Sequence, residues 1–244
     1  MRLELLGTGG FHPNERRHTA CLMLPEIGVV FDAGSSVFRV PPLLKTDEID
    51  LFLTHAHLDH ISGLTNLLVP LLDGRIKSAR VHATDKVLAA IREHLLAEAV
   101  FPIQPAFEYH ELRSEIAIER DGVLRHVELE HPSGSIGYRI DWPGKSMAYI
   151  TDTTVDGSYT EFIRGVDLLV HECYFPDEMA KWSLRTGHSN TTPVAELARE
   201  AQAGRLVLLH IDPQRADDDP IGIETARAIF PNTEVAEDLM AIDF

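Results

Sequence analysis

Short apolar runs rich in β-branched residues recur along this chain and alternate with segments of helical periodicity. This alternation constrains the fold most, because it predicts an α/β protein built in layers. Strand-like runs outnumber the helical segments, which favours two sheets with helices outside over a single parallel sheet. We expect strands at 3–6, 20–24, 28–31, 51–53, 80–82, 126–129, 135–140, 147–150, 168–170 and 206–209. We expect helices at 61–72, 86–96, 177–183, 192–203 and 222–229, the fourth capped by Thr191 or Thr192 and stopped by Gly204.

The length of 244 residues suits one domain over 1–244 with a full hydrophobic core. No apolar run reaches the roughly 18 residues that a membrane-spanning helix needs. The N-terminus lacks the apolar stretch of a signal peptide, and two cysteines are too few for a disulfide framework. These features predict a cytoplasmic protein that does not bind a membrane.

Acidic residues dominate the charge of the chain. Thirty-eight Asp and Glu against 22 Lys and Arg give a formal net charge of −16. Such a charge repels polyanions, whereas a protein that binds nucleic acid without regard to sequence needs a basic face. Long RNA or DNA is therefore disfavoured as a substrate.

Several expected strands lead directly into a residue that can bind a metal ion. Histidine and aspartate are not common in buried positions, so their repeated placement after buried apolar runs needs a cause. Ligands gather at the ends of strands in layered α/β folds, and a shared metal site is one such cause. The residues in question are His55, His131, Asp152, His171 and His210.

The densest local signal is the segment His55-Ala-His57-Leu-Asp59-His60. In extended chain, residues i and i+2 point the same way, so His55 and His57 can grip one ion. Asp59 and His60 lie where the chain turns into a helix and can face a second ion. Imidazole with carboxylate oxygen suits zinc, with manganese or iron as alternatives. The competing interpretation is a group of histidines that binds no metal.

These residues resemble the metallo-β-lactamase superfamily, and within it the branch of ribonuclease Z and phosphodiesterases. The superfamily signature is THAHLDHISGL at 54–64, and TDT at 151–153 resembles its bridging-aspartate motif. HECYF at 171–175 resembles the branch's HEATF segment, and GHSN at 187–190 its catalytic-histidine motif. LLGTGG with Pro13 and Arg16, FDAGSS at 31–36 and LLHI at 208–211 also match. The resemblance implies a four-layer αββα sandwich.

The resemblance also implies a role for each matching residue. His55, His57 and His131 would hold one ion, Asp59, His60 and His210 a second, and Asp152 would bridge them with a hydroxide between the ions. Asp59 would also orient that hydroxide. His188 would stand opposite as a proton donor, with Glu172 fixing its ring orientation.

One departure from the branch concerns the substrate. Bacterial and archaeal ribonuclease Z carries a long arm that grips tRNA, inserted between the third histidine and the bridging aspartate. Here the twenty residues 132–151 leave room for a strand pair and a turn only. We therefore expect a small phosphodiester or a short RNA end as substrate and no stable nucleic-acid complex. A homodimer would fit the branch.

Two other functions and several residues stay open at this point. The same scaffold could hydrolyse a lactone, a thioester or a sulfate ester, or it could bind a metal or small molecule without catalysis. Arg16 and Arg17 are expected in a solvated loop, Asp32 is expected to anchor the glycine turn, and Cys173 is expected to be a buried thiol. His171 receives no assignment.

Overall fold

The computed structural model describes residues 1–215 and 217–244, which form two compact units. The first unit comprises Met1–Arg113 with Glu237–Asp243, and the second comprises Ser114–Ala236 with Phe244. Each unit contains one seven-stranded sheet. The chain thus returns at its end to complete the sheet with which it began.

The first sheet has the strand order β14-β1-β2-β3-β4-β5-β6. β14, β1, β2 and β3 pair antiparallel, and β3 to β6 pair parallel. The strands are β1 (Arg2–Gly7), β2 (Cys21–Leu24), β3 (Val29–Phe31), β4 (Glu48–Phe52), β5 (Ser78–Ala83), β6 (Phe107–Glu111) and β14 (Met240–Asp243).

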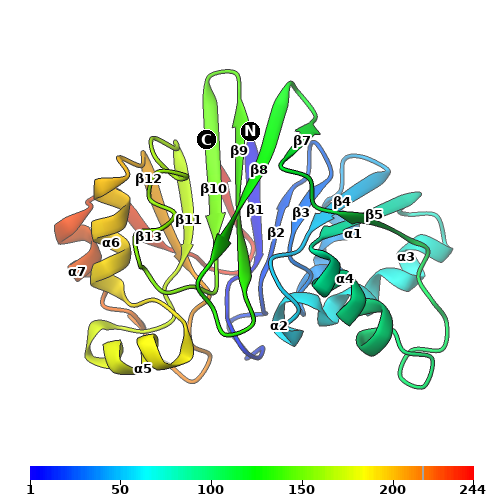
Figure 1. Cartoon of the computed structure of the whole chain (residues 1–244), viewed down its shortest axis with the longest axis horizontal. Coiled ribbons are helices and arrows are strands. Elements are labelled where there is room, and N and C mark those ends of the chain that lie inside the picture. The colour runs from blue at the N-terminus through cyan, green and yellow to red at the C-terminus, as the bar shows by residue number, and fades with distance from the viewer. Residues whose placement is uncertain (216) are drawn as a thin grey trace. The chain divides into compact units, whose positions relative to one another are not determined.

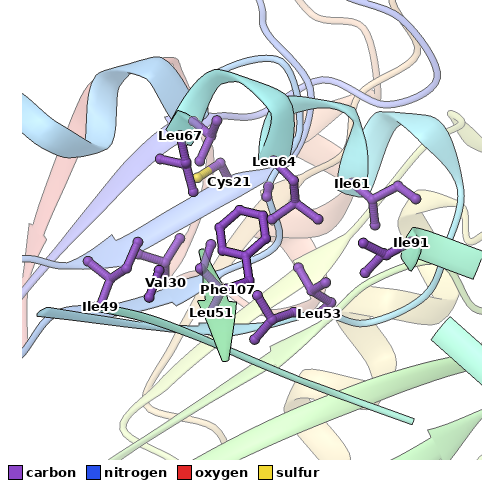
Figure 2. Packing of buried hydrophobic residues seen from close by; sticks show 14 of the residues in the cluster. Cys21, Val30, Ile49, Leu51, Leu53, Ile61, Leu64, Leu67, Ile91 and Phe107 are labelled. Carbon is purple, nitrogen blue, oxygen red and sulfur yellow. The ribbon is translucent and has the colours of Figure 1, made fainter. Parts of the chain in front are cut away.

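Helical segments of the first unit pack on one face of this sheet. Figure 2 shows Ile61, Leu64 and Leu67 in one buried cluster with the strand residues Val30 and Leu51. Because side chains alternate along a strand, Ile49 and Leu51 of β4 enter this core together. The segments are η1 (Val37–Arg39), α1 (Val40–Leu43), α2 (Leu58–Ile61), η2 (Ser62–Leu67), α3 (Leu68–Leu72), α4 (Asp85–Ala90) and η3 (Ile91–Leu95).

The second sheet has the order β13-β12-β11-β10-β9-β8-β7. Its strands are antiparallel from β7 to β10 and parallel from β10 to β13. In Figure 1, α6 and α7 lie together beside β11 to β13. The elements are β7 (Glu115–Ile118), β8 (Gly122–Leu129), β9 (Ser135–Trp142), β10 (Lys145–Ile150), β11 (Leu168–Glu172), β12 (Arg205–Leu209), β13 (Thr233–Val235), η4 (Asp177–Met179), α5 (Ala180–Thr186), α6 (Thr191–Glu200) and α7 (Ile223–Ile229).

The parallel register of β10, β11 and β12 determines where the polar residues that follow these strands lie. Ile150 pairs with His171, and His171 pairs with Leu208. The three strands therefore end at one edge of the sheet, and the residues two positions further along are Asp152 and His210. Register thus delivers two donors from distant parts of the sequence to one edge.

All ten expected strands overlap observed ones, whereas β6, β7, β13 and β14 were not foreseen. These four are the edge strands of the two sheets. Edge strands need no continuous apolar run, and β6 and β7 carry exposed Glu108 and Glu115. The short helical pieces η1 and α1 were also missed.

Several expected helix boundaries need correction: the helix expected to stop at Gly204 ends at Glu200, and the one expected at 177–183 is divided between η4 and α5 and ends at Thr186. The expected helix at 61–72 begins earlier, at Leu58, and is divided among α2, η2 and α3. The helix expected from Thr192 begins at Thr191 with Asn190 at its N-cap position, so neither threonine is the cap. Asp177 accepts hydrogen bonds from the Thr192 N–H and hydroxyl instead. A carboxylate distant in the sequence thus accepts a hydrogen bond from the first turn of this helix, and the local sequence could not reveal that contact.

Candidate metal centre

Two histidines of the first unit face each other just beyond β4. His55 Nε2 lies 2.9 Å from His57 Nδ1. The other nitrogen of His55, Nδ1, lies 3.0 Å from the Thr54 hydroxyl, which itself donates to Asp32. This chain of hydrogen bonds assigns the His55 proton to Nδ1 and leaves Nε2 as the atom that faces His57. Two ring nitrogens at this spacing suit a shared cation.

Asp32 holds the next histidine of the motif. Its Oδ2 lies 2.8 Å from His60 Nδ1, and both side chains are fully buried. Its Oδ1 accepts the Thr54 N–H at 2.8 Å. A carboxylate on Nδ1 fixes the tautomer of the imidazole and leaves Nε2 as the donor atom, as in many metal sites. The sequence predicted only an anchor for the glycine turn, so this contact with His60 is an additional role.

The carboxylate of Asp59 lies beside the Nε2 atom of His60. Asp59 Oδ2 is 3.4 Å from His60 Nε2 and accepts the Phe11 N–H at 2.8 Å. Phe11 makes this bond from a left-handed backbone with φ of 57°. Gly34 packs so closely that a Cβ there would lie 2.3 Å from the Asp59 carbonyl oxygen. The glycine turn therefore admits the ligand segment only because residue 34 has no side chain.

The loop that carries Phe11 is tied down rather than solvated throughout. Arg17 is 3% exposed, donates to the Thr8 hydroxyl at 2.6 Å and pairs with Glu237 at 2.9 Å. The expectation of a solvated loop is therefore wrong for Arg17, although Arg16 is exposed and pairs with Glu237. The Asp238 carboxylate accepts the Thr8 N–H at 3.0 Å. Sequence reasoning missed these bonds because they join the two ends of the chain.

The second unit gathers three donors at the edge where its parallel strands end. Asp152 Oδ1 lies 3.3 Å from His210 Nε2, and Asp152 Oδ2 lies 3.8 Å from His131 Nε2. Both Asp152 and His210 have left-handed backbones, with φ of 50° and 58°. Such conformations cost about 1–3 kcal/mol each and cluster at functional sites. These two residues follow β10 and β12, on either side of β11, and their strained backbones favour a functional role for this edge.

A backbone carbonyl orients the third histidine. His131 Nδ1 lies 2.8 Å from the Gly187 oxygen, so Nδ1 carries the proton. The other nitrogen, Nε2, faces Asp152. Burial lowers the pKa of His131, which keeps the ring neutral and able to bind a metal. Gly187 has φ of 76°, and a Cβ there would lie 2.4 Å from Pro132. Only glycine permits this approach.

Glu172 lies fully buried next to His188. Its Oε1 is 3.1 Å from His188 Nδ1 and accepts the Thr153 N–H at 2.6 Å. Its Oε2 accepts the Ser189 N–H at 3.1 Å. The donor atoms of Glu172, His188 and His210 lie within 4.8 Å of one another, a spacing that could hold a metal. The carboxylate is already engaged on both oxygens, however, so Glu172 is better suited to orient His188 than to ligate.

The remaining polar groups near this edge are structural. His171 is fully buried between the Tyr159 hydroxyl at 2.9 Å and the Glu172 carbonyl oxygen at 2.7 Å, and burial lowers its pKa. Cys173 is buried as expected, and burial raises the pKa of its thiol. Neither residue offers a reactive group to a substrate.

The donor chemistry of both units fits divalent metal. In each of His55, His60 and His131, Nδ1 contacts a hydroxyl, carboxylate or carbonyl oxygen that fixes the ring. Neutral imidazole and carboxylate oxygen are the ligands that zinc, manganese and iron accept. The first unit supplies His55, His57, Asp59 and His60, and the second supplies His131, Asp152 and His210.

No helix in the described part of the chain is long and apolar enough to cross a membrane.

Comparisons with known proteins agree with this architecture. A sequence profile of the family described as the beta-lactamase superfamily domain matches residues 28–211. Ribonuclease Z of Methanosarcina acetivorans is 28% identical over 303 aligned positions, which cover 100% of this chain and 98% of that protein. Because 303 positions exceed the 244 residues of this chain, part of that relative has no counterpart here.

Two solved structures show the same fold. The metallo-β-lactamase fold protein YhfI from Bacillus subtilis matches with a TM-score of 0.83 at 19% identity, over 99% of this chain and 98% of that one. The short form of human tRNase Z matches with a TM-score of 0.78 at 21% identity, over 100% and 99%. The expected α/β fold class is thereby confirmed.

Proposed function

Because the chain belongs to the β-lactamase superfamily, we propose that it is a metal-dependent phosphodiesterase whose two units act as one hydrolase domain over 1–244. The similarity to ribonuclease Z confirms the expected branch and supports this activity. The observation that carries the proposal is the oriented pair of Glu172 and His188 beside the donors Asp152 and His210. An acyl hydrolase has less need of such a proton donor.

The proposed centre holds two divalent ions, with zinc as the expected metal. His55, His57 and His131 would hold the first, Asp59, His60 and His210 would hold the second, and Asp152 would contact both. The contacts that fix Nδ1 of His55, His60 and His131 support this assignment, as do the left-handed backbones of Asp152 and His210. When bound, such ions lower the pKa of a water molecule and neutralise charge on a phosphoryl group.

The side chains of this chain then divide the remaining work. Asp59, fixed by the Phe11 N–H, orients the attacking water. His188 donates a proton to the oxygen that leaves phosphorus, and the Glu172 carboxylate at Nδ1 fixes the ring for this step. An alkoxide leaving group needs that proton, so a phosphodiester matches the assignment.

The proposed substrate is a small phosphodiester or a short RNA end. The relative from Methanosarcina acetivorans is named ribonuclease Z, which favours nucleic-acid chemistry. Only the hairpin of β9 and β10 lies between His131 and Asp152, and the net charge is −16. Both features oppose a stable complex with long RNA. A cytoplasmic location and a homodimer complete the proposal.

The test measures metal content and substrate range on one preparation. The protein is assayed with bis(p-nitrophenyl) phosphate, a dinucleoside monophosphate, a lactone and a thioester, before and after chelation and metal restoration. We expect phosphodiester hydrolysis that chelation abolishes and added zinc restores. Hydrolysis of the lactone or thioester alone would show an acyl hydrolase, and bound metal with no turnover of any substrate would show a binding protein. Either result would overturn the proposal.

A further inference from the structure

Tyr174 contacts the proposed proton donor directly. Its ring stacks on His188 with centroids 4.7 Å apart and an angle of 21° between the planes. It also lies 5.6 Å from the ring of His210. The segment containing Tyr174 is HECYF at 171–175, so the ring lies two residues after Glu172, the partner of His188.

The backbone around Tyr174 is fixed to both histidine-bearing segments. The Cys173 N–H donates to the Leu209 oxygen at 2.8 Å, immediately before His210. The Phe175 N–H donates to the Ser189 oxygen at 3.2 Å, immediately after His188. The ring of Phe175 also meets that of Tyr174 edge to face at 4.7 Å. The backbone on each side of Tyr174 is therefore bonded to a segment that carries one of the two histidines.

The stack restrains a motion of His188 that its hydrogen bond leaves free. The hydrogen bond between Nδ1 and Glu172 fixes the position of one ring atom. The plane of the imidazole could still rotate about that atom. An aromatic face lying nearly parallel to the imidazole opposes this tilt. The His188 backbone is held by Ser183, whose carbonyl accepts the His188 N–H at 3.0 Å. The backbone, one ring nitrogen and one ring face of His188 are therefore all restrained.

We propose that Tyr174 is a positioning residue that holds the plane of His188 for proton delivery to the leaving oxygen. This inference rests on the proposed phosphodiesterase function. In the step concerned, the bond between phosphorus and the leaving oxygen breaks, and the oxygen keeps the electron pair. That oxygen takes a proton from His188, while water supplies the new oxygen on phosphorus and releases a proton that restores His188. Only the first proton transfer depends on the orientation of His188 toward the leaving group.

The leaving group gives a direct readout of this role. A dinucleoside monophosphate releases a sugar hydroxyl and needs the proton, whereas bis(p-nitrophenyl) phosphate releases p-nitrophenolate, which is stable as an anion. We expect Tyr174→Leu to lower kcat for the dinucleoside relative to kcat for the p-nitrophenyl ester by about 10–10²-fold, the cost of a misplaced catalytic group. KM for the two substrates should change little. Tyr174→Phe, which keeps the ring, should restore the ratio.

Controls separate positioning from a loss of structure. Tyr174→Thr provides a second truncation if the leucine variant does not fold, and metal content is measured on each variant. Tyr109→Leu is the matched control, since Tyr109 is a half-buried tyrosine of the first unit that packs on Arg92. It should leave the substrate ratio unchanged. In a His188→Ala background, Tyr174→Leu should have no further effect on that ratio.

Three results would overturn the inference while leaving the proposed function intact. They are an equal loss on both substrates in the truncated variants, an unchanged ratio, and a loss in Tyr174→Phe as large as in Tyr174→Leu. Failure of the wild-type protein to cleave either phosphodiester would instead contradict the proposed function itself.

Discussion

The two units prepare their donors in different ways. The first unit brings four donors from one stretch of six residues, and buried Asp32 and the backbone of Phe11 orient two of them. The second unit collects His131, Asp152 and His210 from three separate strand ends, two of them with left-handed backbones. The first set is thus encoded locally, whereas the second is produced by strand register. We infer that a single substitution of a metal-binding residue should reduce metal binding more in the second unit than in the first.

The largest expected effect follows from removing Asp152. Asp152→Ala should abolish the binding of both ions and lower the rate by more than the factor of about 10²–10⁴ expected for losing a proton donor. His60→Ala, in the first unit, should weaken the binding of one ion. Elemental analysis of both purified variants, with circular dichroism to confirm folding, checks the contrast. Full retention of two ions in Asp152→Ala would refute the bridging role.

The next effect concerns the proton donor. His188→Ala should keep both ions and lower kcat for a dinucleoside monophosphate by about 10²–10⁴-fold, because the leaving oxygen then lacks its acid. Elemental analysis and steady-state kinetics on one sample give both quantities. Loss of metal from this variant would make His188 a ligand, and unchanged turnover would leave it without a catalytic role.

A smaller effect is expected from the partner of His60. Asp32→Asn should weaken metal affinity by about 10–100-fold, since the carboxylate fixes the His60 tautomer and raises its basicity. Asp50→Asn is the matched control, because Asp50 also pairs with a histidine of the first unit, His82, at 2.7 Å. Competition with a chromophoric chelator measures both affinities. Equal weakening in the two variants would mean that general destabilisation, rather than orientation of His60, causes the loss.

The smallest effect is on stability and depends on pH. Burial opposes ionisation of Asp50, but hydrogen bonds from Arg80 and His82 outweigh it and lower the pKa of Asp50 to about 2. A depressed carboxyl pKa stabilises the fold above the unfolded value and loses this effect as pH falls through the folded value. Asp50→Asn should therefore lower the free energy of unfolding by about 1–2 kcal/mol at pH 7, the side chain being partly exposed. Urea unfolding should show the difference shrinking toward pH 2, and a constant difference would contradict this assignment.

Local patterns could predict the donors but not the groups that orient them. The spacing of His55, His57 and His60 and the apolar runs before Asp152 and His210 are visible in the sequence. The bonds of Asp32 to His60 and of Gly187 to His131 join segments far apart, so only the folded chain shows them. The one available signal was an acid directly after the apolar strand that ends at Phe31. Edge strands escaped prediction for a related reason, since exposed strands need little apolar pattern.

The central claim is that seven side chains from both units hold a pair of ions. Anomalous X-ray diffraction from crystals of protein purified without chelator tests it most directly. We expect two metal peaks, one bound by His55, His57 and His131 and the other by Asp59, His60 and His210, with Asp152 contacting both. A single peak, no peak, or an Asp152 carboxylate that touches neither ion would contradict the account.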